Sequence, residues 1–257
     1  MSKLEAKGLR AGYGKKKVLR GIDLSIQEGE FCALLGLNGS GKTTLLKALC
    51  GLIPVKEGSC LIDGQSYLDF NERIRSRLIS YTPQRYSVIS GTTLLDAVLM
   101  GCNPYLPLLS SPGRRERLTA SAALKRVGLA GMDDTVFDEL SEGQKQLVIL
   151  ARAIVQESSV MLFDEPVSSL DFVNCHYVLR LIRDIIRENK RAGLITLHDP
   201  NLALYYCDRI LLIDKGMIAG EILPEHTPLP KIRERLSLLY GNIDVLEYDK
   251  NYYMVKR

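Results

Sequence analysis

A glycine-rich stretch at residues 36–44, Gly-Leu-Asn-Gly-Ser-Gly-Lys-Thr-Thr, constrains the fold of this chain more than any other feature. It matches G-x-x-x-x-G-K-[ST], follows an apolar run of strand type at 31–35, and precedes apolar residues at helical spacing. Glycines here let successive backbone N–H groups approach an anion closely, beside the positive end of the following helix. The stretch therefore predicts a loop that binds the phosphates of a nucleotide. The expected binding residues are Gly36, Asn38, Gly39, Ser40, Gly41, Lys42, Thr43 and Thr44.

Two acidic residues, Asp164 and Glu165, follow a second apolar run at 160–163. Ligands of a parallel sheet bind at the carboxyl ends of its strands, so we expect Asp164 to hold Mg²⁺ together with the Thr43 hydroxyl. Glu165 is a candidate to polarise a water for attack on the γ-phosphorus. Taken alone, this pattern also fits a helix cap, but together with the glycine loop it indicates nucleotide hydrolysis.

Gln84 and His198 are polar residues at expected strand ends. The amide of Gln84 is able to ligate Mg²⁺ or contact a water, although taken alone a glutamine after a proline is more often a polar turn residue. The strand that His198 ends is expected beside the strand of Asp164. This position favours contact of His198 with a γ-phosphate over a purely structural role.

The segment 140–144, Leu-Ser-Glu-Gly-Gln, opens a strongly helical run at 144–155. Ser141 with Gln144 three residues later fits a capping box. A capped helix start that contains Gly143 is also an anion site. One chain cannot easily place two such sites on one triphosphate, which suggests that a second copy supplies this one.

Strands and helices are expected to alternate along most of the chain, which indicates an α/β fold with a mainly parallel sheet. The stretch at about 86–156 is mostly helical and is expected as an insertion. Residues 224–257 are expected to form a tail with one helix and two strand-like runs.

Charge and cysteine usage argue against several other classes of protein. The 34 basic and 30 acidic residues leave a net charge of only +4, which does not favour nucleic acid as a partner. None of the six cysteines forms C-x-x-C, so we expect reduced, buried thiols in a cytosolic protein. No apolar run approaches the ~20 residues that span a bilayer. Any work at a membrane is therefore expected at its surface, through a partner.

These motifs, in this order, resemble those of the ATP-binding subunits of ABC transporters, over residues 4 to about 223. Residues 36–44 are similar to the Walker A motif, and residues 163–165 to the end of Walker B. Residues 140–144 resemble the LSGGQ signature, which is far more specific to this family than Walker A. Gln84 resembles the Q-loop residue, Asp171 the D-loop residue, His198 the switch histidine, and Tyr13 the aromatic residue that stacks on adenine.

The resemblance implies an α/β P-loop NTPase fold of the ABC type. Its parts are a RecA-like α/β core, an N-terminal antiparallel β subdomain and an inserted α-helical subdomain at about 86–156. The ATPase domain would span residues 1–223, and residues 224–257 would be a C-terminal extension. ATP and Mg²⁺ are the implied cofactors. The residues implied in catalysis are Glu165, His198 and Gln84, and those implied at the metal are Thr43, Gln84 and Asp164.

The resemblance also implies that two subunits meet head to tail and enclose two ATP molecules. Ser141, Gly143 and Gln144 of one copy would then act on the ATP of the other, and ATP would favour the closed dimer. Transmembrane permease subunits and, indirectly, a substrate-binding protein are further implied partners. The expected location is peripheral, at the cytoplasmic face of the cell membrane. Glu142 departs from the usual glycine; we expect its side chain to point away from the nucleotide, the alternative being weaker hydrolysis.

Three local segments resemble the corresponding segments in the ATPases of bacterial importers for iron–siderophore, haem and cobalamin. They are residues 101–106, 198–203 and 206–209. They favour a role in powering the import of such a metal chelate. An ATPase for another substrate, such as molybdate or another nutrient, or for an exporter, remains an alternative. A soluble ABC protein that acts in assembly or repair is the third hypothesis.

Overall fold

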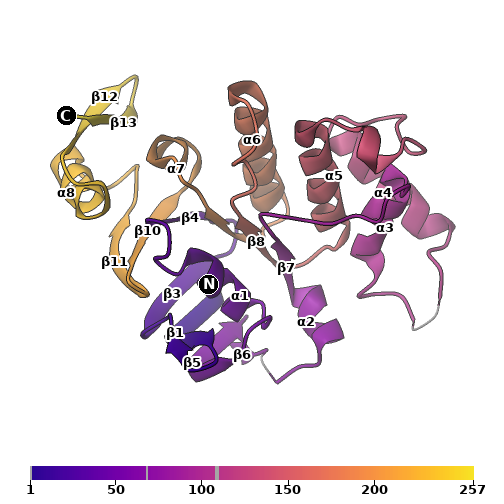
Figure 1. Cartoon of the computed structure of the whole chain (residues 1–257), viewed down its shortest axis with the longest axis horizontal. Helices are drawn as coiled ribbons and strands as arrows, with labels where there is room; N and C mark the ends of the chain where they lie inside the picture. Colours follow the sequence, from indigo (N-terminus) through magenta and orange to yellow (C-terminus); the bar gives the residue numbers. More distant parts are fainter. Residues whose placement is uncertain (1, 68, 108–109) are drawn as a thin grey trace.

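A six-stranded sheet forms the centre of the computed structural model, which describes residues 2–67, 69–107 and 110–257 (Figure 1). The strand order is β11-β10-β4-β9-β8-β7, and all neighbours are parallel except β10 and β11. The strands are β4 (Phe31–Leu35), β7 (Ile79–Thr82), β8 (Val160–Asp164), β9 (Ala192–Thr196), β10 (Arg209–Asp214) and β11 (Met217–Ile222). The expected mainly parallel sheet is confirmed.

Strand β4 explains why this sheet is covered on both faces. Its residues are all buried, and successive side chains of a strand point to opposite faces. Phe31, Ala33 and Leu35 enter one hydrophobic core, whereas Cys32 and Leu34 enter the other. The continuous apolar run at 31–35 is therefore the pattern of a strand buried between two layers.

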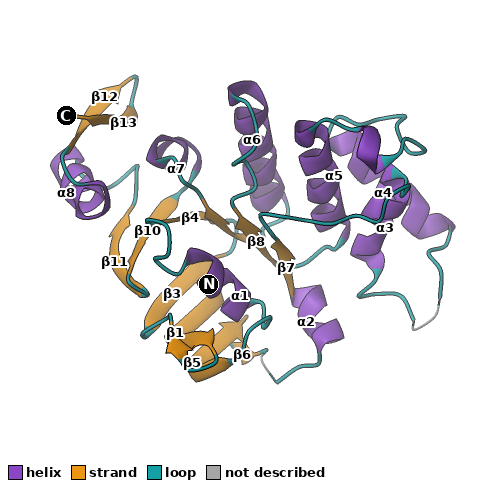
Figure 2. Ribbon diagram, in the orientation of Figure 1, coloured by secondary structure: helices purple, strands orange, loops and turns teal. Residues whose placement is uncertain are grey.

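An antiparallel sheet and helix α1 (Lys42–Leu49) belong to one of these cores (Figure 2). The sheet has the order β2-β1-β5-β6, with β3 paired to β1. Its strands are β1 (Ser2–Tyr13), β2 (Lys16–Lys17), β3 (Ile22–Gln27), β5 (Val55–Ile62) and β6 (Gln65–Ser66). The expected N-terminal antiparallel part is thus present.

Helices cover the other face of the six-stranded sheet, and their apolar residues recur at helical spacing. Helix α6 (Phe172–Glu188), for example, buries one face of apolar side chains in the other core. Helices α3 (Leu94–Leu99), α4 (Arg114–Arg126) and α5 (Glu142–Val155) come between β7 and β8 and pack on one another. Helix α7 (Pro200–Tyr206) and the 3₁₀ turns η1 (Met100–Cys102) and η2 (Phe137–Glu139) contribute to the same core, whereas Leu78 of α2 (Glu72–Leu78) packs against the other core. The bounds expected for the helical subdomain, about 86–156, and for the ATPase domain, 1–223, stay predictions.

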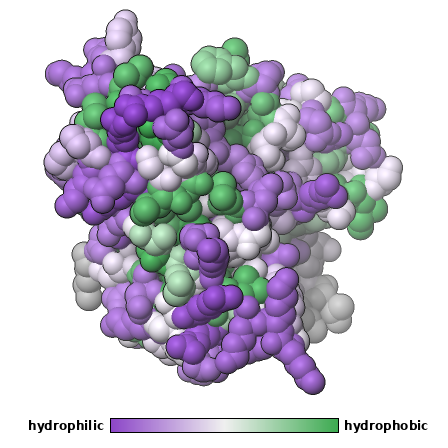
Figure 3. Space-filling view, turned by 60° about the vertical axis from the view of Figure 1, so that its left-hand side comes forward, coloured by the Kyte–Doolittle hydropathy of each residue, from purple (hydrophilic) through white to green (hydrophobic). Residues whose placement is uncertain are grey.

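The tail contains α8 (Leu229–Tyr240) and the hairpin of β12 (Ile243–Tyr248) and β13 (Asn251–Lys256) (Figure 1). The hairpin is fastened to α7, because the Asn201 side chain donates to the Met254 carbonyl at 3.2 Å and accepts the Met254 N–H at 2.7 Å. The face in Figure 3 is mostly hydrophilic, with apolar side chains gathered in patches. Within the described residues, no helix combines the length and apolarity that crossing a membrane requires. The six cysteines are free thiols.

Candidate functional site

The glycine loop connects β4 to α1 with a backbone that only glycine adopts easily. Gly39 and Gly41 have φ angles of 79° and 113°, and Gly41 is the N-cap of α1. At Gly36, an added Cβ would lie 2.5 Å from the carbonyl oxygen of Ile213. The loop is therefore held close to β10, and the start of α1 opens toward the adjacent pocket.

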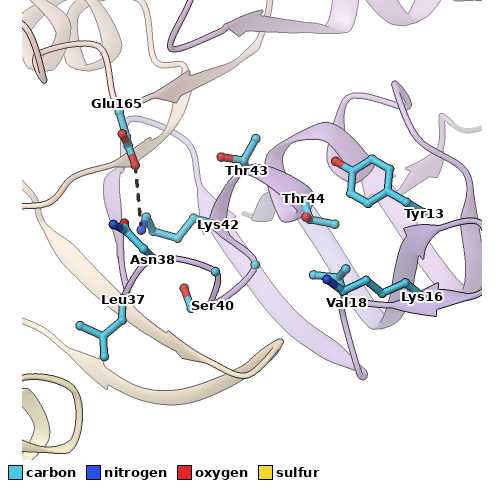
Figure 4. A pocket seen from close by; sticks show the side chains of 12 residues that line it. Tyr13, Lys16, Val18, Leu37, Asn38, Ser40, Lys42, Thr43, Thr44 and Glu165 are labelled. Atoms are coloured by element: carbon cyan, nitrogen blue, oxygen red, sulfur yellow. Dashed lines mark ion pairs between the residues drawn. The ribbon is translucent and has the colours of Figure 1, made fainter.

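This pocket has a volume of about 430 Å³ and is lined mainly by the loop (Figure 4). Tyr13, half-exposed at 48 %, lies across the pocket from Lys42 and Glu165, and Lys16 and Val18 are beside it. The hydroxyl of Ser40 is buried and has no hydrogen-bond partner. An unsatisfied donor in a loop of backbone N–H groups fits a phosphate, so the residues present suit the ligand that the sequence predicts. The full lining is Tyr13, Lys16, Val18, Leu37, Asn38, Gly39, Ser40, Gly41, Lys42, Thr43, Thr44 and Glu165.

Lys42 is buried at the base of the pocket. Its Nζ donates to the Gly36 carbonyl at 2.8 Å and lies 4.0 Å from Oε1 of Glu165 (Figure 4). Burial lowers the pKa of Lys42, and the negative charges of Glu165 and Asp164 oppose that shift. A buried ammonium with incomplete compensation is suited to a polyanionic ligand.

Asp164 ends β8 and is buried among three hydroxyl groups. The hydroxyls of Thr43 and Thr196 donate to its Oδ1 at 3.2 and 3.0 Å, and that of Tyr81 donates to its Oδ2 at 3.0 Å. The carboxylate and the Thr43 hydroxyl are hard oxygen donors next to the phosphate loop. This donor set suits Mg²⁺, which prefers one or two carboxylates together with phosphate oxygens.

Glu165 gathers the other candidates for hydrolysis around its carboxylate. Nε2 of Gln84 donates to Oε2 at 2.6 Å, and Nε2 of His198 lies 2.7 Å from Oε1. The backbone of Glu165 has a φ of 52°, in the left-handed region, and its N–H donates to the Thr196 hydroxyl at 2.8 Å. The structure thus brings Lys42, Gln84, Glu165 and His198 together from four separate segments.

The other predicted residues lie elsewhere. In the part of the chain that the structure describes, Ser141, Gly143, Gln144 and Asp171 are not in the lining of the phosphate pocket. Ser141 caps α5 in a reciprocal capping box with Gln144, with bonds of 3.3 and 3.1 Å. Glu142 pairs with Lys145 of the same helix at 3.0 Å.

Asp171 caps α6 by accepting the Asn174 N–H at 2.8 Å. An added Cβ on Gly143 would lie 3.3 Å from the side-chain amide of Asn174. The starts of α5 and α6 are therefore neighbours, and they form a second surface outside the phosphate pocket.

Five described residues of this site were not predicted from the sequence. Lys16, Val18 and Leu37 line the pocket, and Tyr81 and Thr196 bind Asp164. Thr196 carried a usable signal, since it is a polar residue in an otherwise apolar strand. Tyr81 carried less, because a tyrosine in a strand usually reports packing.

The chain is also similar to proteins that are named for ATP binding in ABC transporters. A family model described as "ABC transporter" matches residues 19–168. The chain is 33% identical over 239 residues to a "Probable iron chelatin transport ATP-binding protein" of Helicobacter pylori, covering 92% of each. It is 37% identical over 213 residues to the "Zinc transport system ATP-binding protein TroB" of Treponema pallidum, covering 82% of this chain and 78% of that protein.

Two solved structures are similar over most of the chain. One is described as "an inward-facing conformation of a putative metal-chelate type ABC transporter", with 26% identity, a TM-score of 0.82, and coverage of 99% and 96%. The other is the dimeric post-hydrolysis state of the cassette MJ0796, bound to ADP and Pi. It has 26% identity and a TM-score of 0.76, with 87% of this chain and 100% of that one covered.

Proposed function

Because this chain belongs to the ABC transporter family, as an ATP-binding ATPase subunit, we propose that it powers the import of a metal chelate of the iron–siderophore, haem or cobalamin type. The similarity over 92% of the chain to a relative named for iron chelatin carries this proposal. The likeness to a structure described as metal-chelate type supports it. The segments 101–106, 198–203 and 206–209 point to the same class of substrate.

In this proposal, the phosphate pocket binds ATP and Lys42 contacts its terminal phosphates. Backbone N–H groups of the loop and the Ser40 hydroxyl satisfy phosphate oxygens, and the ring of Tyr13 stacks on the base. Mg²⁺, when bound, would neutralise phosphate charge, and Thr43, Asp164 and Gln84 are the residues that would hold it.

Hydrolysis is assigned to the group of side chains around Glu165. Its carboxylate orients the attacking water and accepts its proton, as a general base requires. His198 contacts the γ-phosphate, and its closeness to Oε1 of Glu165 supports that assignment. Gln84 bonds to the same carboxylate, so it is placed to report the state of the site to the rest of the chain.

The second surface is assigned to the ATP of a partner copy. Ser141, Gly143 and Gln144 lie outside the phosphate pocket, so in a head-to-tail dimer they face the ATP held by the partner's loop. ATP then binds the closed dimer better than the open one, which drives the conformational change. Membrane permease subunits receive that change, and the chain is peripheral at the cytoplasmic face. A substrate-binding protein delivers the chelate.

A second candidate is import of a free divalent metal ion, because the chain is 37% identical to the relative named for zinc transport. Reconstitution of the chain with its membrane subunits in vesicles separates the two. We expect ATP-dependent uptake of a ferric siderophore, haem or cobalamin, and no uptake with Glu165→Gln in place of the native chain. Uptake of free Zn²⁺ or Mn²⁺ without any chelate would contradict the proposal and support the second candidate.

A further inference from the structure

Thr196 is a polar residue at a fully buried position, at the carboxyl end of β9. It lies directly opposite Asp164 in the pairing of β8 and β9. A hydroxyl in such a place requires partners, because a buried polar group without a hydrogen bond is destabilising. Its two close partners both belong to the pair of acids at the end of β8.

The single hydroxyl group of Thr196 serves both acids at once. It donates its proton to Oδ1 of Asp164 at 3.0 Å and accepts the backbone N–H of Glu165 at 2.8 Å. The carbonyl of Phe163, at 3.5 Å, is a poorer acceptor than the carboxylate, since charge-assisted bonds are shorter and stronger. One side chain therefore connects the expected metal ligand to the backbone of the expected base.

The backbone of Glu165 shows why this connection matters. In a regular strand, Asp164 and Glu165 would point to opposite faces of the sheet. With a φ of 52°, Glu165 leaves the strand and directs its carboxylate to Lys42, Gln84 and His198. Left-handed backbone is strained for a residue with a side chain, and the hydrogen bond from the Glu165 N–H to the Thr196 hydroxyl helps to hold it.

We propose that Thr196 is a positioning residue for ATP hydrolysis, whose hydroxyl sets the carboxylate of Asp164 and the backbone turn at Glu165 in one arrangement. Thr196 is not in the lining of the phosphate pocket, so it acts through these two acids and not on ATP itself. This inference rests on the roles proposed for Asp164 and Glu165.

The test compares Thr196→Val, which keeps the shape and removes the hydroxyl, with Thr196→Ser, which keeps the hydroxyl. In the full chain with its membrane subunits, we expect Thr196→Val to lower kcat by roughly 10–100-fold, the usual effect of losing a group that orients a metal ligand. The KM for ATP should change by less than about threefold, because the phosphate loop is untouched. Thr196→Ser should restore most of the lost kcat.

A second measurement does not depend on turnover. We expect Thr196→Val to reduce the gain in ATP affinity that Mg²⁺ provides over EDTA, measured with a fluorescent nucleotide. Thr82→Val is the matched control: Thr82 is another buried threonine at a strand end, and the structure records no bond from its hydroxyl to either acid. It should alter neither kcat nor the gain in affinity from Mg²⁺.

Two results would overturn the inference: equal losses of kcat in Thr196→Val and Thr196→Ser, or full activity in Thr196→Val. Glu165→Gln, measured in parallel, separates this failure from that of the proposed mechanism. If Glu165→Gln hydrolyses ATP at the native rate, the role of Glu165 itself is wrong. If it is inactive while Thr196→Val is fully active, only the role of Thr196 is wrong.

Discussion

We expect the affinity for ATP to depend on pH through the side chain of Lys42. Burial lowers its pKa below the ordinary value of 10.5 in the unliganded chain, and phosphate oxygens beside Nζ would raise it again. Below the lowered pKa the lysine is already charged, so the affinity does not depend on it. Above that pKa, binding must take up a proton, so affinity falls as pH rises, by at most about tenfold per pH unit. Calorimetric titration from neutral to alkaline pH measures this. Lys42→Ala should bind ATP weakly without the alkaline decline, and a decline that persists in it would assign the effect elsewhere.

Ser141 is the N-cap of helix α5, and we expect its effect on helix capping to be separable from its effect on dimerisation. Ser141→Ala should destabilise the chain by about 1 kcal/mol, because it removes the N-cap. Ser141→Asp keeps a good N-cap, so its unfolding free energy should stay within about 0.5 kcal/mol of native. Its carboxylate would however oppose the partner's γ-phosphate, so ATP should no longer stabilise the dimer. Chemical denaturation and sedimentation with ATP, both in a Glu165→Gln background, measure the two effects. An ATP-stabilised dimer of Ser141→Asp would show that this helix start does not face the nucleotide.

For the whole molecule, we expect each ATP site to be shared between two copies of the chain, because Ser141 and Gly143 lie outside the phosphate pocket. Lys42→Ala and Ser141→Asp should each be inactive alone. In an equal mixture, half of the dimers would be mixed, and each mixed dimer would contain one intact site of two. The mixture should therefore recover up to about a quarter of native ATPase activity. Activity that stays at the level of the separate variants would indicate that each chain hydrolyses ATP without its partner's residues.

The structure brings together many of the residues that local patterns singled out. The phosphate loop depends on glycine φ angles, a preceding strand and a following helix, all of which are encoded within the continuous segment 31–49. The closeness of His198 to Glu165 was also predictable, because parallel strands β8 and β9 end at the same edge of the sheet. The second surface at Ser141 was recognisable from its capping box and its family motif.

The sequence by itself therefore determined the fold class, the phosphate loop and the pair of acids, since these are set by short-range periodicity and backbone preference. Only the tertiary structure decided that the hydroxyls of Tyr81 and Thr196 meet on Asp164. It also decided that the tail hairpin is fastened to α7 through Asn201. The reason is physical: β7 and β9 are far apart along the chain, and burial of both faces of the sheet places them on either side of β8. No local preference of the chain encodes that order.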